Sequence, residues 1–139
     1  MTLTKAHRAY FKAAKAVSEL SDFNKMHIGA VAIYGHKIIS SGTNMKKTNP
    51  TQKLYNRYRF DGDAGVHSLH AEVQCLLPLM NRKDIDFSKV SLYIYREHKN
   101  HTPGLSRPCP SCMQLIRDLG IRNIYYTGEG SYISENLIY

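Results

Sequence analysis

Hydrophobic and polar positions alternate with a helical period at the start of the chain. Apolar side chains recur every three or four residues and form one stripe, made of Ala6, Tyr10, Ala13, Val17 and Leu20. A second stripe on the other side of this segment is mostly basic, and Thr4 stands where a helix N-cap belongs. The pattern predicts an amphipathic helix over residues 4–20 with its basic stripe in solvent.

Short apolar runs bounded by turn residues predict the strands of a sheet. Gly35-His36 separates the first two runs, which indicates a hairpin. From His70 the pattern is helical until Pro78, which cannot donate a backbone hydrogen bond, and a further helix covers 113–119. The predicted strands are 28–34, 37–40, 90–95 and 122–127.

The end of the chain decides the direction of the final strand. A parallel strand needs a crossover of about a dozen residues or more, and only nine residues follow Gly130. An antiparallel hairpin therefore joins 122–127 to 132–138. The order of elements predicts the α/β class, with a mixed sheet of about five strands whose last two are antiparallel.

Length and composition limit the classes of protein. The 139 residues suffice for a single domain, over 1–139. No apolar run reaches the roughly 18 to 20 residues of a membrane span, and the N-terminus lacks the apolar core of a signal peptide. We therefore expect a cytoplasmic protein. The three cysteines are an odd number, which argues against a disulfide framework and favours thiols kept for a metal or for catalysis.

The net charge of +8 is unevenly distributed along the chain. Residues 1–60 hold eleven Lys and Arg against only Glu19 and Asp22, a net of +9, whereas residues 61–139 have a net charge of −1. This asymmetry indicates either a polyanionic partner or anionic substrate, or a solvated basic surface that aids solubility. Charge alone leaves both interpretations open.

Much of the positive charge lies in residues 44–60, which we call the basic loop. Basic and aromatic side chains on one segment suit phosphates and stacked bases together. The alternative is a solvated loop whose tyrosines pack on the core. The candidate nucleic-acid or phosphate contacts are Lys46, Lys47, Lys53, Tyr55, Arg57, Tyr58 and Arg59.

A cysteine pair marks a candidate metal site. Cys109 and Cys112 have the spacing that lets two thiolates at a helix start bind one metal ion, although a redox pair or half of a structural zinc site has the same spacing. Cys75 lies inside a predicted helix and is interpreted as a small buried apolar residue. His70 then becomes the third ligand, and Glu72 is placed to act on a water in the open fourth position.

The combination of His70-x-Glu72 with Pro108-Cys109-x-x-Cys112 resembles the zinc-dependent cytidine/deoxycytidylate deaminase superfamily, including its small phage-type and bacterial members. The resemblance implies a three-layer α/β/α catalytic domain with zinc as cofactor. It also implies a hydrolase acting on the C–N bond of a cyclic amidine. In that chemistry Glu72 carries protons from water to the base and then to the departing amine.

The same resemblance implies substrate contacts. The backbone amide of Ala71 holds the carbonyl of the base, Asn44 holds the sugar, and the backbone carbonyl of Arg107 holds the amine. We also count Tyr126 among the substrate-binding residues. Twelve residues, 96–107, separate a strand from Pro108, unlike the almost direct connection of the transfer RNA adenosine deaminases, and this favours cytosine as the base.

The form of the substrate remains a choice between two enzymes. The charge of the first half and the basic loop favour cytosine in single-stranded DNA. The alternative is a free nucleotide, as in a deoxycytidylate (dCMP) deaminase, or a cytidine deaminase. A non-catalytic zinc module that binds nucleic acid is the most distant alternative, because a structural site has no need of Glu72. We expect no membrane partner, and homo-oligomer formation is left open.

Overall fold

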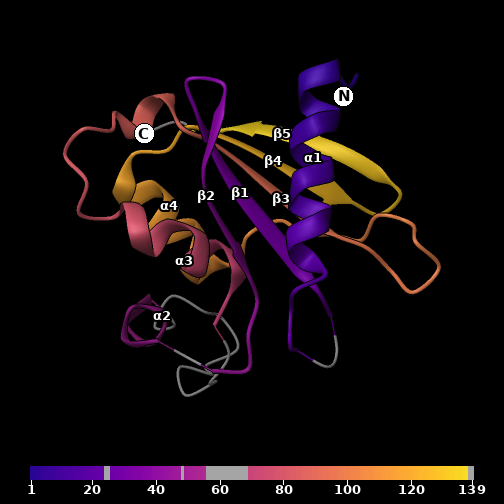
Figure 1. The fold of residues 1–139 in the computed structure, drawn as a ribbon, viewed down its shortest axis with the longest axis horizontal. Coiled ribbons are helices and arrows are strands. Elements are labelled where there is room, and N and C mark those ends of the chain that lie inside the picture. Colours follow the sequence, from indigo (N-terminus) through magenta and orange to yellow (C-terminus); the bar gives the residue numbers. More distant parts are fainter. Residues whose placement is uncertain (24–25, 48, 56–68, 138–139) are drawn as a thin grey trace.

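A mixed β-sheet lies between two helical layers in the computed structural model, which describes residues 1–23, 26–47, 49–55 and 69–137 (Figure 1). Within these ranges, two short 3₁₀ turns accompany the regular helices. In chain order the elements are α1 (Lys5–Ser18), β1 (Ile28–Tyr34), β2 (Lys37–Thr43), α2 (Pro50–Tyr55), α3 (Ala71–Leu76), η2 (Leu77–Leu79), η3 (Phe87–Lys89), β3 (Ser91–Arg96), α4 (Pro110–Leu119), β4 (Asn123–Gly128) and β5 (Ser131–Asn136).

The sheet has the strand order β2-β1-β3-β4-β5. β3 and β4 are parallel, and α4 forms the crossover between them. The pairs β1–β2, β1–β3 and β4–β5 are antiparallel. The prediction of an α/β fold with five strands and an antiparallel last pair is therefore confirmed.

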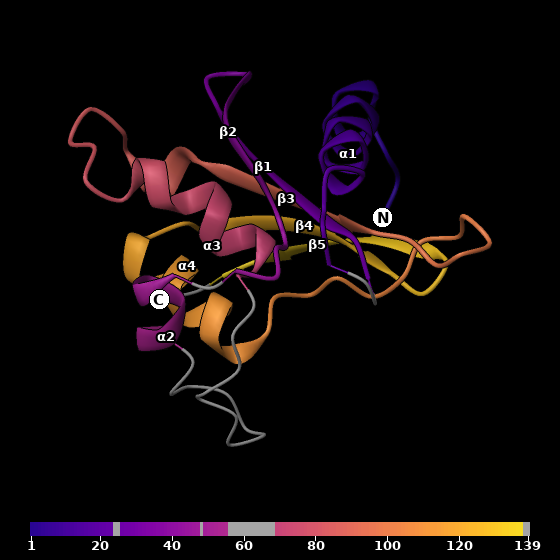
Figure 2. The same ribbon diagram turned by 60° about the horizontal axis from the view of Figure 1, so that its bottom comes forward.

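Each face of the sheet is covered by helices (Figure 2). On one face, Phe11 and Ala14 of α1 pack against Val31, Ile33, Tyr93 and Tyr95. On the other face, the larger core joins α3 and α4 to Ala30, Ala32, Leu92 and Ile94. Because β1 and β3 are buried on both sides, their sequences are nearly continuous apolar runs rather than alternating ones.

The close approach of α3 to β2 depends on Gly42. A Cβ built at this position would lie 2.4 Å from the backbone nitrogen of Cys75 and 2.6 Å from the carbonyl oxygen of Ala71. Both contacts are shorter than atoms tolerate, so only glycine fits without moving the helix. Gly42 thereby sets how closely α3, with Glu72 in its first turn, packs on the sheet.

The helix starts and ends follow local sequence signals. Thr4 caps α1 as predicted, because its hydroxyl accepts a hydrogen bond from the backbone nitrogen of His7 at 3.1 Å. The regular part of α3 ends at Leu76, and the 3₁₀ turn that follows contains Pro78. Among the described residues, no helix has the length and apolar character to span a bilayer.

The basic loop differs from the prediction, because it contains the helix α2. Pro50 is the first residue of this helix. Proline is favoured there because the first helical turn needs no donor from it. The side chain of Asn49 accepts a hydrogen bond from the backbone nitrogen of Thr51 at 2.8 Å, which supports the helix start.

Candidate active site

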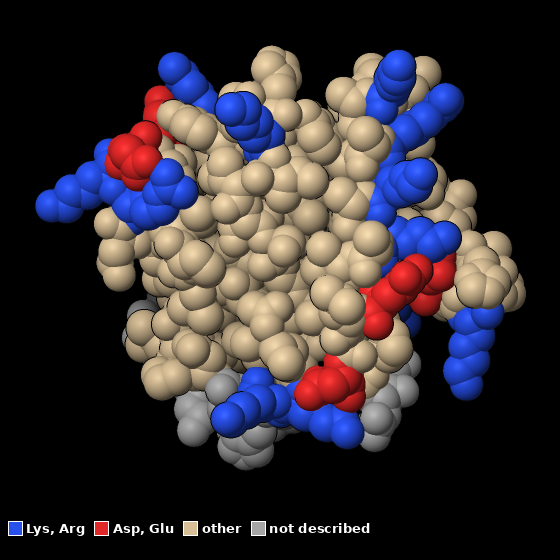
Figure 3. Space-filling view, in the orientation of Figure 1, with Lys and Arg blue, Asp and Glu red and all other residues tan. Residues whose placement is uncertain are grey.

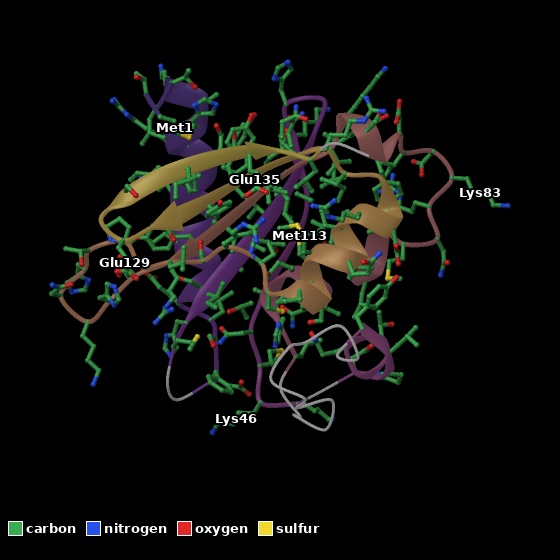
Figure 4. All side chains as sticks on the ribbon, turned by 180° about the vertical axis from the view of Figure 1, so that it is seen from behind. Met1, Lys46, Lys83, Met113, Glu129 and Glu135 are labelled. Atoms are coloured by element: carbon green, nitrogen blue, oxygen red, sulfur yellow. The ribbon has the colours of Figure 1, made fainter. Side chains whose placement is uncertain are left out.

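A cavity of about 350 Å³ opens where the starts of α3 and α4 approach the sheet. It is bordered by the segment before β1, by the first residues of α3, and by the connection from β3 to α4. Figure 4 shows this connection and α4 from behind, with Met113 labelled on the helix. The lining residues are Phe23, Met26, Ile28, Asn44, His70, Ala71, Glu72, Arg96, Leu105, Ser106, Arg107 and Cys109.

The three predicted metal ligands lie together beside this cavity, and two of them, His70 and Cys109, line it. His70 is the N-cap residue of α3, Cys109 is the N-cap residue of α4, and Cys112 lies in the first turn of α4. The Nδ1 atom of His70 lies 3.2 Å from the Sγ atom of Cys112 and 3.4 Å from that of Cys109. All three ligand atoms lie within 4.8 Å of one another.

This group fits zinc. Ligand atoms around a tetrahedral zinc, with bonds of about 2.0 to 2.3 Å, stand roughly 3.3 to 3.8 Å apart, which is close to the spacing of these side chains. One imidazole nitrogen and two thiols are also the donor types that zinc prefers. Cys75, although buried and nearby in sequence, is not part of the group.

The thiols of the two cysteines in this group have pKa values shifted in opposite directions. A hydrogen bond from Cys112 lowers the pKa of the Cys109 thiol far below its ordinary value, and His70 lowers it further. The same hydrogen bond, together with burial, raises the pKa of Cys112. The hydroxyl of Ser111 also lies 3.0 Å from the Cys109 sulfur. One thiolate is therefore already favoured, and a bound cation would favour the second.

Glu72 lies in the same cavity and is buried, with 5% of its surface exposed. Burial raises the pKa of its carboxyl group to about 7, and the nearby His70 opposes part of this shift. A carboxyl group with a pKa near the pH of the cell can both accept and donate a proton. Glu72 is thus suited to general acid-base chemistry next to the metal group.

The polar side chain of Gln52 supports the metal group, although nothing in the sequence predicted this. Gln52 belongs to α2, is fully buried, and accepts a hydrogen bond from the backbone nitrogen of His70 at 3.0 Å. On α3, the Oε1 atom of Gln74 accepts a hydrogen bond from the backbone nitrogen of Thr43 at 2.6 Å. These amides tie α2, the start of α3 and the end of β2 together.

Three of the four predicted substrate-binding residues line the cavity: Asn44, Ala71 and Arg107. The amide of Asn44 holds the segment before β1, since its Oδ1 accepts from the backbone nitrogen of Ile28 and its Nδ2 donates to the carbonyl of Met26, both at 2.9 Å. Tyr126 is not among the described lining residues, and its hydroxyl donates to Glu135 at 2.9 Å.

The basic loop is placed only in part. Lys46 and Lys47 are exposed and do not line the cavity. The ring of Tyr55 packs against the core, and its hydroxyl donates to Asp118 at 2.6 Å. Lys53 belongs to α2, but its side chain, like the residues Arg57, Tyr58 and Arg59, lies outside what the structure describes.

Sequence reasoning also missed the apolar and basic walls of the cavity. Phe23, Met26 and Leu105 supply apolar surface, and Arg96 supplies a second guanidinium group beside Arg107. The connection between β3 and α4 is not a plain loop, since Glu97 and Pro103 form an isolated β-bridge. Ser106 fixes its far end, with its hydroxyl 2.8 Å from that of Thr127.

Known proteins share this architecture. A dCMP deaminase from the cyanophage S-TIM5 superimposes with a TM-score of 0.63 at 22% identity, covering 90% of this chain and 84% of that one. A cytidine deaminase from Burkholderia pseudomallei gives 0.64 at 20% identity, covering 98% and 93%. At these identities the likeness establishes the fold. No curated protein matches the chain in sequence.

The family is established by a separate match. Residues 4–128 match the family described as the cytidine and deoxycytidylate deaminase zinc-binding region. The matched residues include α1, all of β1 to β4, and both helix starts that carry the group of His70, Cys109 and Cys112. This covers well over half of the 139 residues, so the chain belongs to the zinc-binding cytidine and deoxycytidylate deaminase family.

Proposed function

We propose that this protein hydrolyses the exocyclic amine of cytosine in a free nucleotide, as a dCMP-type deaminase. The observation that carries the proposal is the meeting of His70, Cys109 and Cys112 with the buried Glu72 at one cavity of about 350 Å³. This volume suits one nucleotide. A structure of the cyanophage S-TIM5 dCMP deaminase in complex with dCMP and dUMP, similar in fold, supports the same substrate class.

The chemistry follows from the position of Glu72. Zinc, held by His70, Cys109 and Cys112, would supply the Lewis acid that makes water nucleophilic near neutral pH. Glu72 takes a proton from the attacking water and gives it to the ring nitrogen while oxygen bonds to the carbon bearing the amine. Glu72 then delivers the second proton to the exocyclic nitrogen. The carbon–nitrogen bond breaks, so cytosine and water become uracil and ammonia.

Substrate placement in this proposal uses the residues around Glu72. The backbone amide of Ala71, at the first position of α3, holds the carbonyl of the base, and the backbone carbonyl of Arg107 holds the amine. One N–H of Asn44 remains for the sugar after its bond to Met26. Phe23 and Met26 offer apolar surface to the base.

The test is a Glu72→Gln variant, offered dCMP, deoxycytidine and a single-stranded oligonucleotide. We expect it to fold and retain zinc but to lose activity by about 10²- to 10⁴-fold, because proton transfer is lost. Uracil formation measures turnover, and elemental analysis measures zinc. Glu19→Gln, which makes the same change at an exposed acid after α1, is the matched control. A fully active Glu72→Gln enzyme would contradict the mechanism.

A second candidate is deamination of cytosine in single-stranded DNA. It is favoured by the net charge of +9 in residues 1–60. In Figure 3, Lys and Arg side chains follow α1 along the right side and gather again at the lower edge of the molecule. The packing of Tyr55 against the core removes one of the stacking surfaces that this candidate would use.

A further inference from the structure

The cavity contains two arginines with different electrostatic surroundings. Among the described residues that line it, Arg96 and Arg107 are the basic side chains. They come from the two ends of the connection between β3 and α4. A nucleotide would bring a phosphate into this cavity, whereas a nucleoside would not. A guanidinium group that is available to bind the phosphate would therefore favour the nucleotide. The inference drawn from these two arginines rests on the function proposed above.

The charge of Arg107 is already balanced by Glu135. The Nε and Nη2 atoms of Arg107 donate to the two carboxylate oxygens of Glu135 at 3.0 and 2.9 Å. This hydrogen bonding lowers the pKa of Glu135 below its ordinary value, so the carboxylate stays ionised. Tyr126 donates to the same carboxylate at 2.9 Å. Arg107 is therefore held against β5, where Figure 4 labels Glu135, and its charge is largely neutralised.

Among the described residues, no carboxylate forms an ion pair of this kind with Arg96. Its Nη1 atom donates to the carbonyl of Leu105 at 3.3 Å. The acidic group in its neighbourhood is Glu129, which is hydrogen-bonded to the ring of His98 and accepts from the backbone nitrogen of Leu105 at 3.1 Å. The pKa of Glu129 is lowered mainly by His98 and only weakly by the charge of Arg96. Arg96 is half-buried and keeps donors for an incoming anion.

The backbone of Arg96 is held firmly. It is the last residue of β3, opposite Ile28 in the antiparallel pair with β1, and Ile28 also lines the cavity. Its backbone nitrogen donates to the hydroxyl of Thr127 at 3.2 Å, and its carbonyl accepts from Gly104 at 2.9 Å. The fixed strand end sets where the Arg96 side chain starts relative to the cavity, and the planar guanidinium presents its donors in a rigid fork.

The position of Arg96 also suits the geometry of a nucleotide. The metal group and Glu72 are half-buried or buried, whereas Leu105, to which Arg96 is bonded, is 49% exposed. Arg96 therefore lies where the cavity lining reaches the exposed Leu105, and we take this part of the lining as the rim of the cavity. A base bound beside Glu72 would direct its sugar and phosphate toward this rim. We propose that Arg96 binds the 5′-phosphate of the substrate and makes the enzyme selective for a nucleoside monophosphate over a nucleoside.

An Arg96→Gln variant tests this role, because it removes the charge and keeps a donor for the Leu105 carbonyl. We expect kcat/KM for dCMP to fall about 10- to 100-fold, mainly through KM, as for a lost charge-assisted hydrogen bond. Turnover of deoxycytidine should stay within about twofold, since the nucleoside has no phosphate. Lys99→Gln, an equal change of charge at an exposed residue, is the control, and Arg96→Lys should recover part of the loss.

A binding measurement separates this role from the proposed reaction. In the inactive Glu72→Gln background, Arg96→Gln should weaken binding of dCMP and leave deoxycytidine unchanged, as titration calorimetry can measure. If dCMP binds through Arg96 but no cytosine compound is deaminated, the phosphate site stands and the proposed function fails. Equal losses for dCMP and deoxycytidine, or a loss confined to an oligonucleotide, would overturn the assignment of Arg96.

Discussion

Cysteine chemistry in this protein is decided by each thiol's surroundings. Cys75 is fully buried in the larger core, and burial raises the pKa of its thiol to about 12. Cys109 is partly exposed at the start of α4 and carries a pKa that is shifted downward. The same residue type is therefore an inert apolar filler at one position and a ready metal ligand at another.

This contrast predicts the behaviour of alanine variants. Cys75→Ala should keep one zinc per chain and lose about 1 kcal/mol of stability, because it removes only a small buried group. Cys112→Ala, which removes a sulfur from the metal group, should lose its zinc. Elemental analysis of both purified variants checks the prediction, with thermal unfolding as the measure of stability. Loss of zinc from Cys75→Ala would show that the ligand assignment is wrong.

At the scale of elements, the short helix α2 acts as a support for the start of α3. Its buried Gln52 accepts the hydrogen bond of the His70 backbone, so α2 helps to fix the direction of the imidazole. A helix of six residues contributes little stability of its own. The contribution of α2 comes from this hydrogen bond and from its packing near α4, where the hydroxyl of Tyr55 donates to Asp118.

A Gln52→Leu variant tests the support by α2. Leucine has a similar size but cannot accept the hydrogen bond, so the buried His70 amide loses this acceptor, at a cost of about 1 to 3 kcal/mol. We expect a lower unfolding temperature and faster loss of zinc to a chelator, with deaminase activity falling in parallel. Gln114→Leu makes the same change at the less buried Gln114 of α4 and should alter zinc retention little. Unchanged zinc retention in Gln52→Leu would contradict a supporting role.

The elements differ in how far the sequence foretells them. Periodic patterns predict the strands and long helices, and the motif around His70, Glu72, Cys109 and Cys112 predicts the metal group. α2 escaped prediction because six residues carry no repeat. Gln52 and Arg96 escaped because their partners lie far away in sequence or are backbone groups. The contact from Gln52 to His70 spans 18 residues, and Arg96 lies opposite Ile28 only because β3 pairs with β1, a strand far away in the sequence.

The whole molecule carries its excess charge in its first half, over α1 and the basic loop. This distribution serves either a DNA strand, as sequence analysis favoured, or the general attraction of an anionic nucleotide. The packing of Tyr55 against the core favours the free nucleotide, whereas the charge together with the basic loop favours the strand. Salt dependence distinguishes them, because a strand places several phosphates on the protein and a nucleotide places one.

If the substrate is a free nucleotide, the Glu72→Gln protein should bind an oligonucleotide weakly, and its affinity should depend little on salt. A triple variant in which Lys53, Arg57 and Arg59 are changed to Ala should show the same weak salt dependence. Each phosphate contact with a single strand would add about −0.7 to the slope of log affinity against log salt. The triple variant should also retain dCMP turnover. A steep slope that the triple change reduces would establish the DNA reading in its place. Fluorescence anisotropy across a salt series provides the measurement.

The contact between Gly42 and α3 has a consequence for tolerance to mutation. Gly42 touches no substrate and offers no chemical group, yet any side chain there would press on the backbone at Ala71 and Cys75. The displaced helix would carry Glu72 away from the metal group, so a catalytic defect would arise from a position with no catalytic atom. In a screen of random variants, substitutions of Gly42 would abolish activity as often as substitutions of a metal-ligating residue. The cause would be steric alone.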